Sequence, residues 1–405
     1  MSDDASDDGK WRALATLSVA ELFAMSLWFS ATAVAPELAA LWDLSAAEAA
    51  WLTMAVQAGF VVGALGSAAL TLADVVPTRY LFAASALVGA GATALLGSVD
   101  GALPAVALRF LTGVALAGVY PPGMKLVSGW FRAGRGLAIG TLIGALTVGS
   151  ALPHLVRAVG GVGRPRLVLY AAAGLAVVGA ALVLLVEEGP YGVPAAPFDP
   201  RAVGRILRDR PTVLANLGYF GHMWELYAVW TWIPTYLAAS FAARAGEAPA
   251  LASALAFAAI AAGSLGAAAF GLAADRWGRT TLTSASMVAS GSACVLAGVV
   301  FGGSIGLVAP FVLVWGFVIV ADSAQFSASV TELADERYVG TALTLQTALG
   351  FLLTVVTIQA TPLVAEVVGW RWAFAPLVVG PAVGTLAMLR LRALPAARRL
   401  AGGAR

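Results

Sequence analysis

The stretch Gly271-Leu272-Ala273-Ala274-Asp275-Arg276-Trp277-Gly278-Arg279 lies between two long apolar segments. A similar stretch, Leu72-Ala73-Asp74-Val75-Val76-Pro77-Thr78-Arg79, holds the same kind of position earlier in the chain. The two aspartates are 201 residues apart (275 − 74), and the first copy lacks the leading and central glycines. A charged turn that recurs between apolar segments predicts a chain made of two similar halves.

The composition indicates a membrane protein. Apolar residues make up 60% of the chain, charged residues only 11%, and the mean hydropathy is +0.87. Soluble domains are roughly one quarter charged. Many apolar runs are long enough to cross a membrane, which takes about 20 helical residues. The runs are continuously apolar and do not alternate as the strands of a membrane β-barrel would, so the expected fold is all-α.

We expect twelve transmembrane helices in two pseudo-symmetric six-helix bundles. The bundles occupy residues 11–186 and 211–393, a cytoplasmic linker covers 187–210, and polar cytoplasmic tails cover 1–10 and 394–405. The first tail is acidic and is expected to be disordered. The helices are predicted near residues 11–40, 51–72, 80–98, 102–128, 137–157, 166–186, 211–240, 250–273, 281–302, 307–330, 341–366 and 371–393.

The distribution of basic residues predicts the orientation, because cytoplasmic loops carry the excess of Lys and Arg. With the N-terminus inside, 17 of the 24 basic residues fall on the cytoplasmic side and 5 on the outer side. The remaining two (24 − 17 − 5), Arg109 and Lys125, lie within a helix. Both termini are therefore expected in the cytoplasm and the chain in the cell membrane. The net charge of +2 then reflects orientation and gives no sign of a nucleic-acid partner.

The repeated turn resembles the signature of the loops between helices 2 and 3, and 8 and 9, of the major facilitator superfamily. Arg109-Phe110-Leu111-Thr112-Gly113 resembles the Arg-x-x-x-Gly motif of its fourth helix, and Trp130-Phe131 with Arg132 and Arg135 resembles the loop that follows. The resemblance covers essentially the whole chain. It implies a secondary transporter in which two parallel bundles rock around a substrate held near the membrane midplane.

The same resemblance makes the loops conformational switches. It assigns this role to Asp74, Arg79, Gly271, Asp275, Arg276, Gly278 and Arg279. Gly278 is expected to permit a tight reversal, because glycine tolerates backbone angles that other residues avoid. The fifth helix departs from the drug-exporter pattern, since Gly140, Gly144, Ala145 and Gly149 are not accompanied by the proline that exporters carry after the second glycine.

Ionisable residues inside the spans are the first site candidates, because charges there are costly. Glu21 lies about ten residues into the first helix, or roughly 15 Å deep. We interpret it as the proton-coupling acid and Arg109 as its counter-charge. The alternative is structural: Arg109 holds backbone carbonyls or helix ends, and Glu21 pairs with it.

The seventh helix carries a second cluster of candidates. It combines a carboxyl, a histidine and several aromatic rings before Pro234. The first helix, its repeat counterpart, also carries an acid and aromatic residues. We expect a substrate cavity lined by Trp28, Tyr120, His222, Trp224, Glu225, Tyr227 and Trp230. The alternative is that the Trp and Tyr residues anchor the helix at the membrane boundary.

Lys125 and Asp322 lie toward the cytoplasmic ends of the repeat-equivalent fourth and tenth helices. An ion pair between them would close a cytoplasmic gate in the outward-facing state. The alternative for Lys125 is that its flexible side chain snorkels to the lipid headgroups. The Tyr120-Pro121-Pro122-Gly123 stretch is expected to break the fourth helix.

These features favour a transporter over an enzyme, because the sequence lacks catalytic spacings of Ser, His and acidic residues and a phosphate-binding Gly-x-x-x-x-Gly-Lys loop. No cofactor or metal is expected, and Cys294 is the only cysteine. The expected function is proton-coupled transport of a small polar or anionic solute by a monomer, loosely similar to porters of nitrate, cyanate and organic anions. The alternatives are a proton-coupled exporter of amphipathic compounds and a non-transporting membrane receptor.

Overall fold

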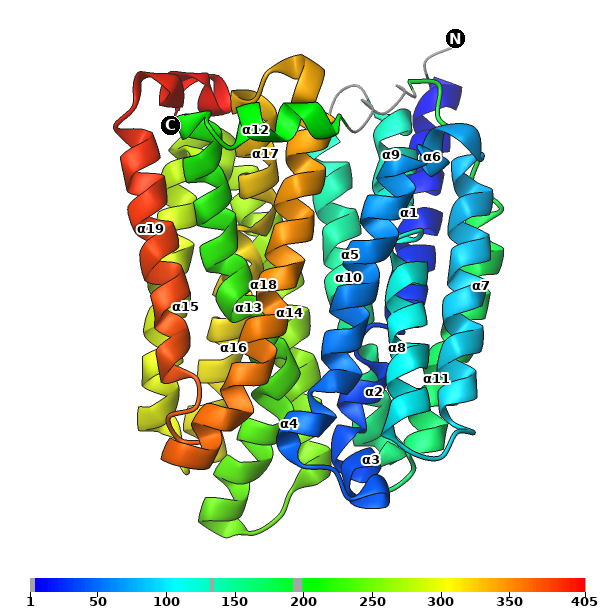
Figure 1. Ribbon diagram of the computed structural model, residues 1–405, viewed down its shortest axis with the longest axis vertical. Helices are drawn as coiled ribbons and strands as arrows, with labels where there is room; N and C mark the ends of the chain where they lie inside the picture. Colours follow the sequence, from blue (N-terminus) through cyan, green and yellow to red (C-terminus); the bar gives the residue numbers. More distant parts are fainter. Residues whose placement is uncertain (1–3, 132–134, 192–198, 405) are drawn as a thin grey trace. The chain divides into compact units, whose positions relative to one another are not determined.

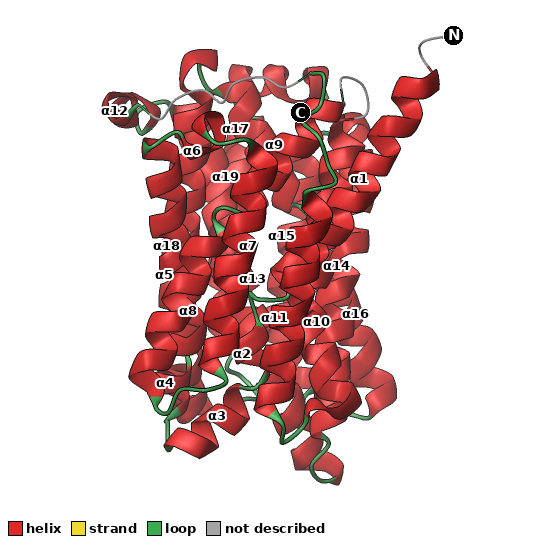
Figure 2. Cartoon of the chain, turned by 90° about the vertical axis from the view of Figure 1, so that its right-hand side faces the viewer, coloured by secondary structure: helices red, strands yellow, loops and turns green. Residues whose placement is uncertain are grey.

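The computed structural model describes residues 4–131, 135–191 and 199–404, and every regular element among them is a helix (Figure 2). Nine of the described helices are long and apolar enough to cross a membrane, or ten if the bent pair Ala375–Arg392 and Pro395–Gly403 is one span. The fold is thus the all-α membrane fold expected from the sequence. The count of twelve spans stays a prediction.

The chain divides into two compact units, which correspond approximately to the predicted bundles. Unit 1 contains Met1–Leu44 and Ala55–Ala195, and unit 2 contains Ser45–Met54 and Ala196–Arg405. The grouping of Ser45–Met54 with unit 2 differs from the continuous bundles drawn from the sequence. The expected disordered tail also differs from the structure, because the first helix already begins at Asp4.

Unit 1 runs from the blue to the green helices of Figure 1. Its elements are α1 (Asp4–Met25), α2 (Ser30–Ala33), α3 (Ala35–Trp42), most of α5 (Trp51–Ala69), α6 (Leu72–Val75), α7 (Thr78–Leu96), α8 (Ala102–Leu116), α9 (Tyr120–Trp130), α10 (Arg135–Val156), the π-helical turn η1 (Arg157–Gly161) and α11 (Pro165–Val183).

Unit 2 runs from the green to the red helices of Figure 1 and also includes α4 (Ala46–Ala49). Its other elements are η2 (Pro200–Ala202), α12 (Val203–Ile206), α13 (Arg210–Ala245), α14 (Pro249–Trp277), α15 (Arg279–Val300), α16 (Ile305–Ala321), α17 (Ser323–Leu333), η3 (Glu336–Tyr338), α18 (Val339–Val368), η4 (Ala375–Val378), α19 (Val379–Arg392) and η5 (Pro395–Gly403).

The fourth span of each half is interrupted at the same place in the repeat. In unit 1 the span breaks between α8 and α9, and α9 begins at Tyr120 with prolines in its first turn, which confirms the predicted break. In unit 2 the span breaks between α16 and α17 at Asp322. Gly118 in the first break and Asp322 in the second are 204 residues apart (322 − 118). Each half therefore has a helix break at the same position of the repeat.

The first spans of the two halves differ. The single helix predicted over 11–40 is wrong, because α1 ends at Met25 and α2 and α3 follow as short pieces. Ser26 Oγ donates to the carbonyl of Phe23 at 2.7 Å and to that of Ala172 in α11 at 3.1 Å, so this serine bonds outside the regular helical ladder. The repeat counterpart α13 is continuous over 36 residues, despite Pro234 inside it.

Glycines set the closest helix crossings, and the same crossing occurs in both units. A β-carbon on Gly59 of α5 or Gly113 of α8 would collide with backbone of the other helix. In unit 2 the same holds for Gly266 of α14 and Gly316 of α16. Small residues allow this approach where lipid offers no hydrophobic driving force between helices. Each crossing fixes the helix that carries the break described above.

Candidate functional site

The carboxyl of Glu21 is enclosed within unit 1 and lacks a partner. Glu21 is fully buried in α1, and neither carboxyl oxygen has a hydrogen-bond partner among the described residues. A β-carbon built on Gly123 of α9 would lie 2.6 Å from Glu21 Oε2, so the carboxyl occupies space beside the start of α9. A buried polar group without a partner calls for an explanation, and a proton or a ligand can supply one.

Arg109 holds the backbone at the break of the first span. This buried side chain of α8 donates from Nη1 to the carbonyl of Leu27 at 2.9 Å and to Ser30 Oγ at 3.1 Å, and from Nη2 to the carbonyl of Trp28. These carbonyls lie between α1 and α2, and that of Leu27 also accepts from Ser30 Oγ at 2.9 Å. Among the described residues, neither Glu21 oxygen accepts a hydrogen bond from Arg109. In this structure Arg109 contacts backbone carbonyls, and both interpretations of its role stay hypotheses.

Two further buried polar residues lie in unit 1, and of these Gln57 was not singled out in the sequence. Gln57 of α5 is fully buried, and neither its amide nitrogen nor its amide oxygen has a partner in the described part of the chain. His154 of α10 is also buried with both ring nitrogens unpartnered, and its ring centroid lies 6.4 Å from that of Phe29. The signal for Gln57 was available, because it is an amide within an apolar run.

Trp28 and Tyr120 of the predicted cavity both belong to unit 1. Trp28 is buried, and its ring centroid lies 5.1 Å from that of Phe60 in α5. Tyr120 is half-buried at the first position of α9, three residues before Gly123. Tyr120 thus begins the same helix whose glycine borders the Glu21 carboxyl.

In unit 2, α13 brings His222 to Asp322. His222 Nδ1 lies 3.0 Å from Asp322 Oδ1, and both side chains are about 98% or more buried (1% and 2% exposed). The distance is that of an ion pair, although the atoms are not aligned for a hydrogen bond. The His222 ring also packs 5.6 Å from Phe326 of α17. The acid at the break of the fourth span is therefore held by the first helix of its own half.

One turn further along α13, Glu225 has two hydrogen-bond donors. Ser290 Oγ of α15 donates to Glu225 Oε1 at 2.5 Å, and Cys294 Sγ donates to Oε2 at 3.3 Å. All three residues are fully buried or nearly so. The sequence predicted Glu225 as a site residue but missed its two partners, which lie one turn apart on a helix 65 or more residues away.

The aromatic candidates of α13 divide into two groups. The Tyr227 ring centroid lies 5.6 Å from that of Trp230 and 5.2 Å from that of Phe351 in α18, so these rings form one buried cluster. Trp224 is half-buried and packs against Gly380 of α19. The expected set of lining residues is thus distributed over more than one face of α13.

Lys125 lies at the predicted switch loop of unit 1. Its Nζ is 2.6 Å from Asp74 Oδ1 and also donates to the carbonyl of Ala73 in α6. Asp74 therefore accepts from the fourth span of its own half. Arg79 lies over the ring of Tyr80, with its guanidinium carbon 4.9 Å from the ring centroid. The gate pair of Lys125 with Asp322 stays a prediction.

The second switch loop is held by Arg279 at the start of α15. Its Nε and Nη2 donate to the two carboxyl oxygens of Glu332 at 2.9 and 2.6 Å, and its Nη1 donates to Gln325 Oε1 at 2.7 Å. Gly278 between α14 and α15 has φ +85°, a conformation that favours glycine. The Ala401 N–H of η5 also donates to Glu332, at 3.0 Å. The loop is thus tied to α17 and to the C-terminal segment.

The remaining residues predicted for this switch loop are Gly271, Arg276 and Asp275. Gly271 lies inside α14, where a β-carbon would meet nothing within 4 Å, and Arg276 is exposed in the last turn of that helix. The side chain of Asp275 lies outside the described part of the chain.

Asp335 lies in the loop between α17 and α18. Hydrogen bonds from Arg337 lower the pKa of Asp335 to about 2, which keeps this exposed acid charged.

A family model of the Major Facilitator Superfamily matches residues 17–356. The chain belongs to the major facilitator superfamily. It is therefore a multi-pass membrane transporter and not an enzyme. No curated protein matches the sequence.

Solved structures share the fold of this superfamily member. The nucleoside transporter NupG, solved as a mutant, is 16% identical with a TM-score of 0.72, over 94% of this chain and 99% of that one. A bacterial homologue of the human lysosomal transporter Spinster is 14% identical in two inward-facing structures. The occupied form has a TM-score of 0.72 over 95% of this chain and 97% of that one. The unoccupied form has a TM-score of 0.73 over 95% and 99%. At these identities the likeness shows the fold alone.

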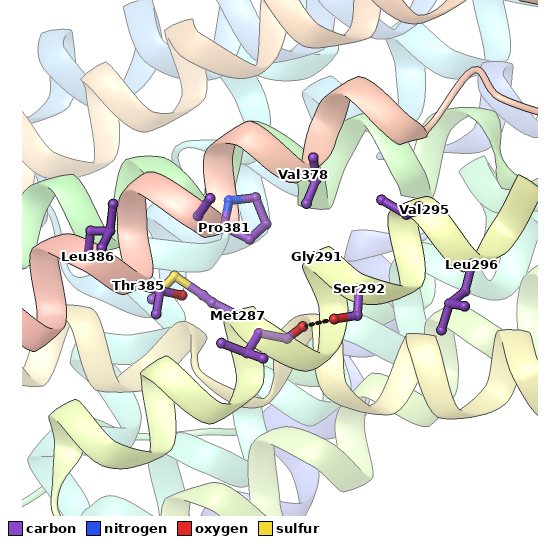
Figure 3. Close-up of a pocket in the computed structure, with 11 residues that line it drawn as sticks. Met287, Gly291, Ser292, Val295, Leu296, Val378, Pro381, Thr385 and Leu386 are labelled. Carbon is purple, nitrogen blue, oxygen red and sulfur yellow. Dashed lines mark hydrogen bonds between the residues drawn. The ribbon is translucent and has the colours of Figure 1, made fainter.

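One groove of this superfamily member lies apart from the site built above. It measures about 770 Å³ and lies between α15 and α19, as Figure 3 shows. Apolar residues form most of its lining, and Ser292, one of its few polar residues, bonds to its own helix at Val288 O, 2.7 Å away. A groove without an ionisable lining residue offers nothing for proton coupling. The ionisable candidates lie instead inside the two units.

Proposed function

We propose that this transporter moves a small polar solute together with protons, and that Glu21 carries the coupling proton. The observation that carries the proposal is the Glu21 carboxyl, which is fully buried and has no partner in the described part of the chain. Burying an isolated carboxylate is costly, so the neutral acid suits the enclosed state. Exposure to water in another state of the cycle would allow the proton to leave.

The contacts of the basic residues favour a polar solute over an anion. An anion requires an available positive charge, but Arg109 bonds to backbone carbonyls, Lys125 bonds to Asp74, and the His222 ring lies 3.0 Å from Asp322. The buried groups without a hydrogen-bond partner in the described part of the chain include the amide of Gln57 and the imidazole ring of His154. These groups can both donate and accept hydrogen bonds, which suits a solute that carries donors and acceptors itself.

The two compact units support a cycle of alternating access. In transporters built from such repeats, one bundle rocks against the other around the site. Each unit has its own close glycine crossing and its own switch-loop contacts, so each is suited to move as one body. We place both termini in the cytoplasm, from the excess of basic residues there, and we propose that a monomer suffices because one chain contains both bundles.

A second candidate is export of amphipathic compounds. The observation that favours it is the buried cluster of Tyr227, Trp230 and Phe351, which offers flat apolar surface to a ring-containing compound. Such a compound would still use Glu21 for its proton. The two candidates therefore differ in substrate and direction and share the coupling residue.

The test is a flux screen in proteoliposomes that contain the full chain and an internal pH dye. The solutes are nucleosides, sugars and amino acids, with nitrate and an amphipathic cation as representatives of the other classes. Nucleosides are included because NupG, which shares the fold, is a nucleoside transporter. Wild type is compared with Glu21→Gln and with Glu48→Gln, a matched change of an exposed acid that caps α4.

The expected result is solute uptake driven by an inward proton gradient in wild type and Glu48→Gln. Glu21→Gln should retain solute exchange but lose proton-driven uptake. Extrusion of the cation alone would replace the main proposal with the exporter. Binding of a solute without flux in any variant would indicate a receptor, and unchanged proton-driven uptake in Glu21→Gln would remove Glu21 from the coupling role.

A further inference from the structure

Unit 2 contains a second buried carboxyl at the position that corresponds to Glu21. Glu225 follows Glu21 by 204 residues (225 − 21), the same spacing that separates Gly118 from Asp322 at the two helix breaks. Both acids are fully buried, and each lies in the first long helix of its half. The repeat therefore places one buried carboxyl in each unit.

The hydrogen bonds around Glu225 suit both of its protonation states. In the charged state, the Ser290 hydroxyl donates to Oε1 at 2.5 Å and the Cys294 thiol donates to Oε2 at 3.3 Å. Ser290 Oγ also lies 3.4 Å from the carbonyl of Met287 in its own helix. When Glu225 gains a proton, the serine hydroxyl can turn to Met287 and accept the new O–H of Glu225. Neither state leaves the serine or the acid oxygen unsatisfied.

The charged groups around Glu225 leave it free to change its own charge. Asp322, from the break between α16 and α17, acts on Glu225 electrostatically, and His222 lies 3.0 Å from Asp322. From α15, the facing groups are the neutral Ser290 and the thiol of Cys294. The His222 ring thus lies beside Asp322, and no basic side chain in the described residues forms an ion pair with Glu225.

We propose that Glu225 is a second proton-binding site, which gains and loses a proton separately from Glu21, so that each half of the transporter carries one. The proton leaves Glu225 to water when its unit opens and returns from water on the other side. Proton binding at Glu225 does not depend on the proposed function. Its use in transport does, and it would raise the stoichiometry to two protons per cycle.

The test is pH-difference infrared spectroscopy of the full chain in lipid vesicles without added solute. The readout is the carbonyl stretch of protonated carboxylic acids, which is present only in the acid form. Wild type is compared with Glu225→Gln, Glu21→Gln and Ser290→Ala. Ser292→Ala is the matched control, because this serine lies on the same helix and bonds only to that helix at Val288 in the structure described.

We expect two pH-dependent components in the wild-type band. Glu225→Gln should remove one component and Glu21→Gln the other. Ser290→Ala should shift the frequency of the Glu225 component alone, because the acid loses its hydrogen-bond partner, whereas Ser292→Ala should shift neither. Since Ser290→Ala keeps both carboxyls, it also serves if a Glu225 variant fails to fold.

Two results would overturn the proposal. If the pH-dependent band of Glu225→Gln equals that of wild type, Glu225 does not change its proton in this range and is structural. If Ser290→Ala leaves the whole band unshifted, the two-state hydrogen bonding is wrong. The outcome is separable from that of the flux screen, because a titrating Glu225 without any solute flux would contradict the proposed function only.

Discussion

Gly123 in α9 leaves the space that the carboxyl of Glu21 in α1 occupies. A β-carbon on Gly123 would lie 2.6 Å from Glu21 Oε2, well inside van der Waals contact. The glycine therefore sets the position of an acid that is 102 residues away in the sequence (123 − 21).

The first prediction concerns Gly123→Ala. The added β-carbon meets the end of a flexible side chain, so the Glu21 carboxyl should move aside at little cost in stability, and proton-driven uptake should fall because the acid is displaced. The measurement is flux in proteoliposomes at equal protein content. Gly91→Ala in α7 is the control, because a β-carbon there meets nothing within 4 Å. Equal uptake in the two variants would contradict the proposed role of Gly123.

The second prediction concerns Arg109→Lys. The guanidinium reaches the carbonyls of Leu27 and Trp28 with two nitrogens, whereas lysine offers one nitrogen. The Leu27 carbonyl keeps its bond from Ser30 Oγ, but losing a buried hydrogen bond from a charged group costs roughly 1.5–3 kcal/mol, so the variant should unfold at a lower temperature in detergent. Arg79→Lys is the control, since this arginine stacks on an exposed tyrosine. A wild-type melting temperature for Arg109→Lys would show that these bonds do not stabilise the break.

The third prediction concerns the pair of Arg279 and Glu332. The side chains are 13% and 26% exposed, so water screens the pair in part. We expect a coupling free energy of about 1 kcal/mol from a double-mutant cycle with Arg279→Gln and Glu332→Gln, measured by thermal unfolding. The hydrogen bond from Arg279 to Gln325 is lost in both variants that carry Arg279→Gln, so its loss cancels in the cycle. Additive effects of the two changes would mean that the bidentate pair contributes nothing measurable.

The fourth prediction separates two roles of Lys125. In the structure it bonds to Asp74, and the sequence predicts that it meets Asp322 in another state of the cycle. If the gate exists, reversing the charges with Lys125→Asp and Asp322→Lys should restore flux that each single change removes. If Lys125 only holds the switch loop, rescue should instead come from Lys125→Asp with Asp74→Lys. Rescue by the second pair alone would remove the gate.

The fold could be predicted from the sequence because the mean hydropathy of a segment is enough to identify a membrane-spanning helix. Twenty apolar residues predict a span whatever their neighbours are, and the motif around Asp275 identified the repeat. The break at Tyr120 was also predictable, since prolines act on their own helix. The break after Met25 was not, because the carbonyls there are held by Arg109, a residue more than 80 positions away.

The candidate site could be predicted only in part, because the contacts of each residue depend on how the helices pack. An acid inside a span is visible in the sequence, and so Glu21, Glu225 and Asp322 were found. Their partners are decided by how helices are rotated against each other. Serine and cysteine are common in apolar helices, and nothing in their spacing singles out Ser290 and Cys294 as the donors to Glu225.

The glycine crossings have a consequence for reading mutational tolerance in this chain. Any side chain at Gly59, Gly113, Gly266 or Gly316 would push backbone away from backbone. In a library of random substitutions these four codons should therefore be depleted of nearly every replacement, as strongly as the buried acids. Depletion alone would not distinguish a position that touches cargo from one that only lets two helices meet.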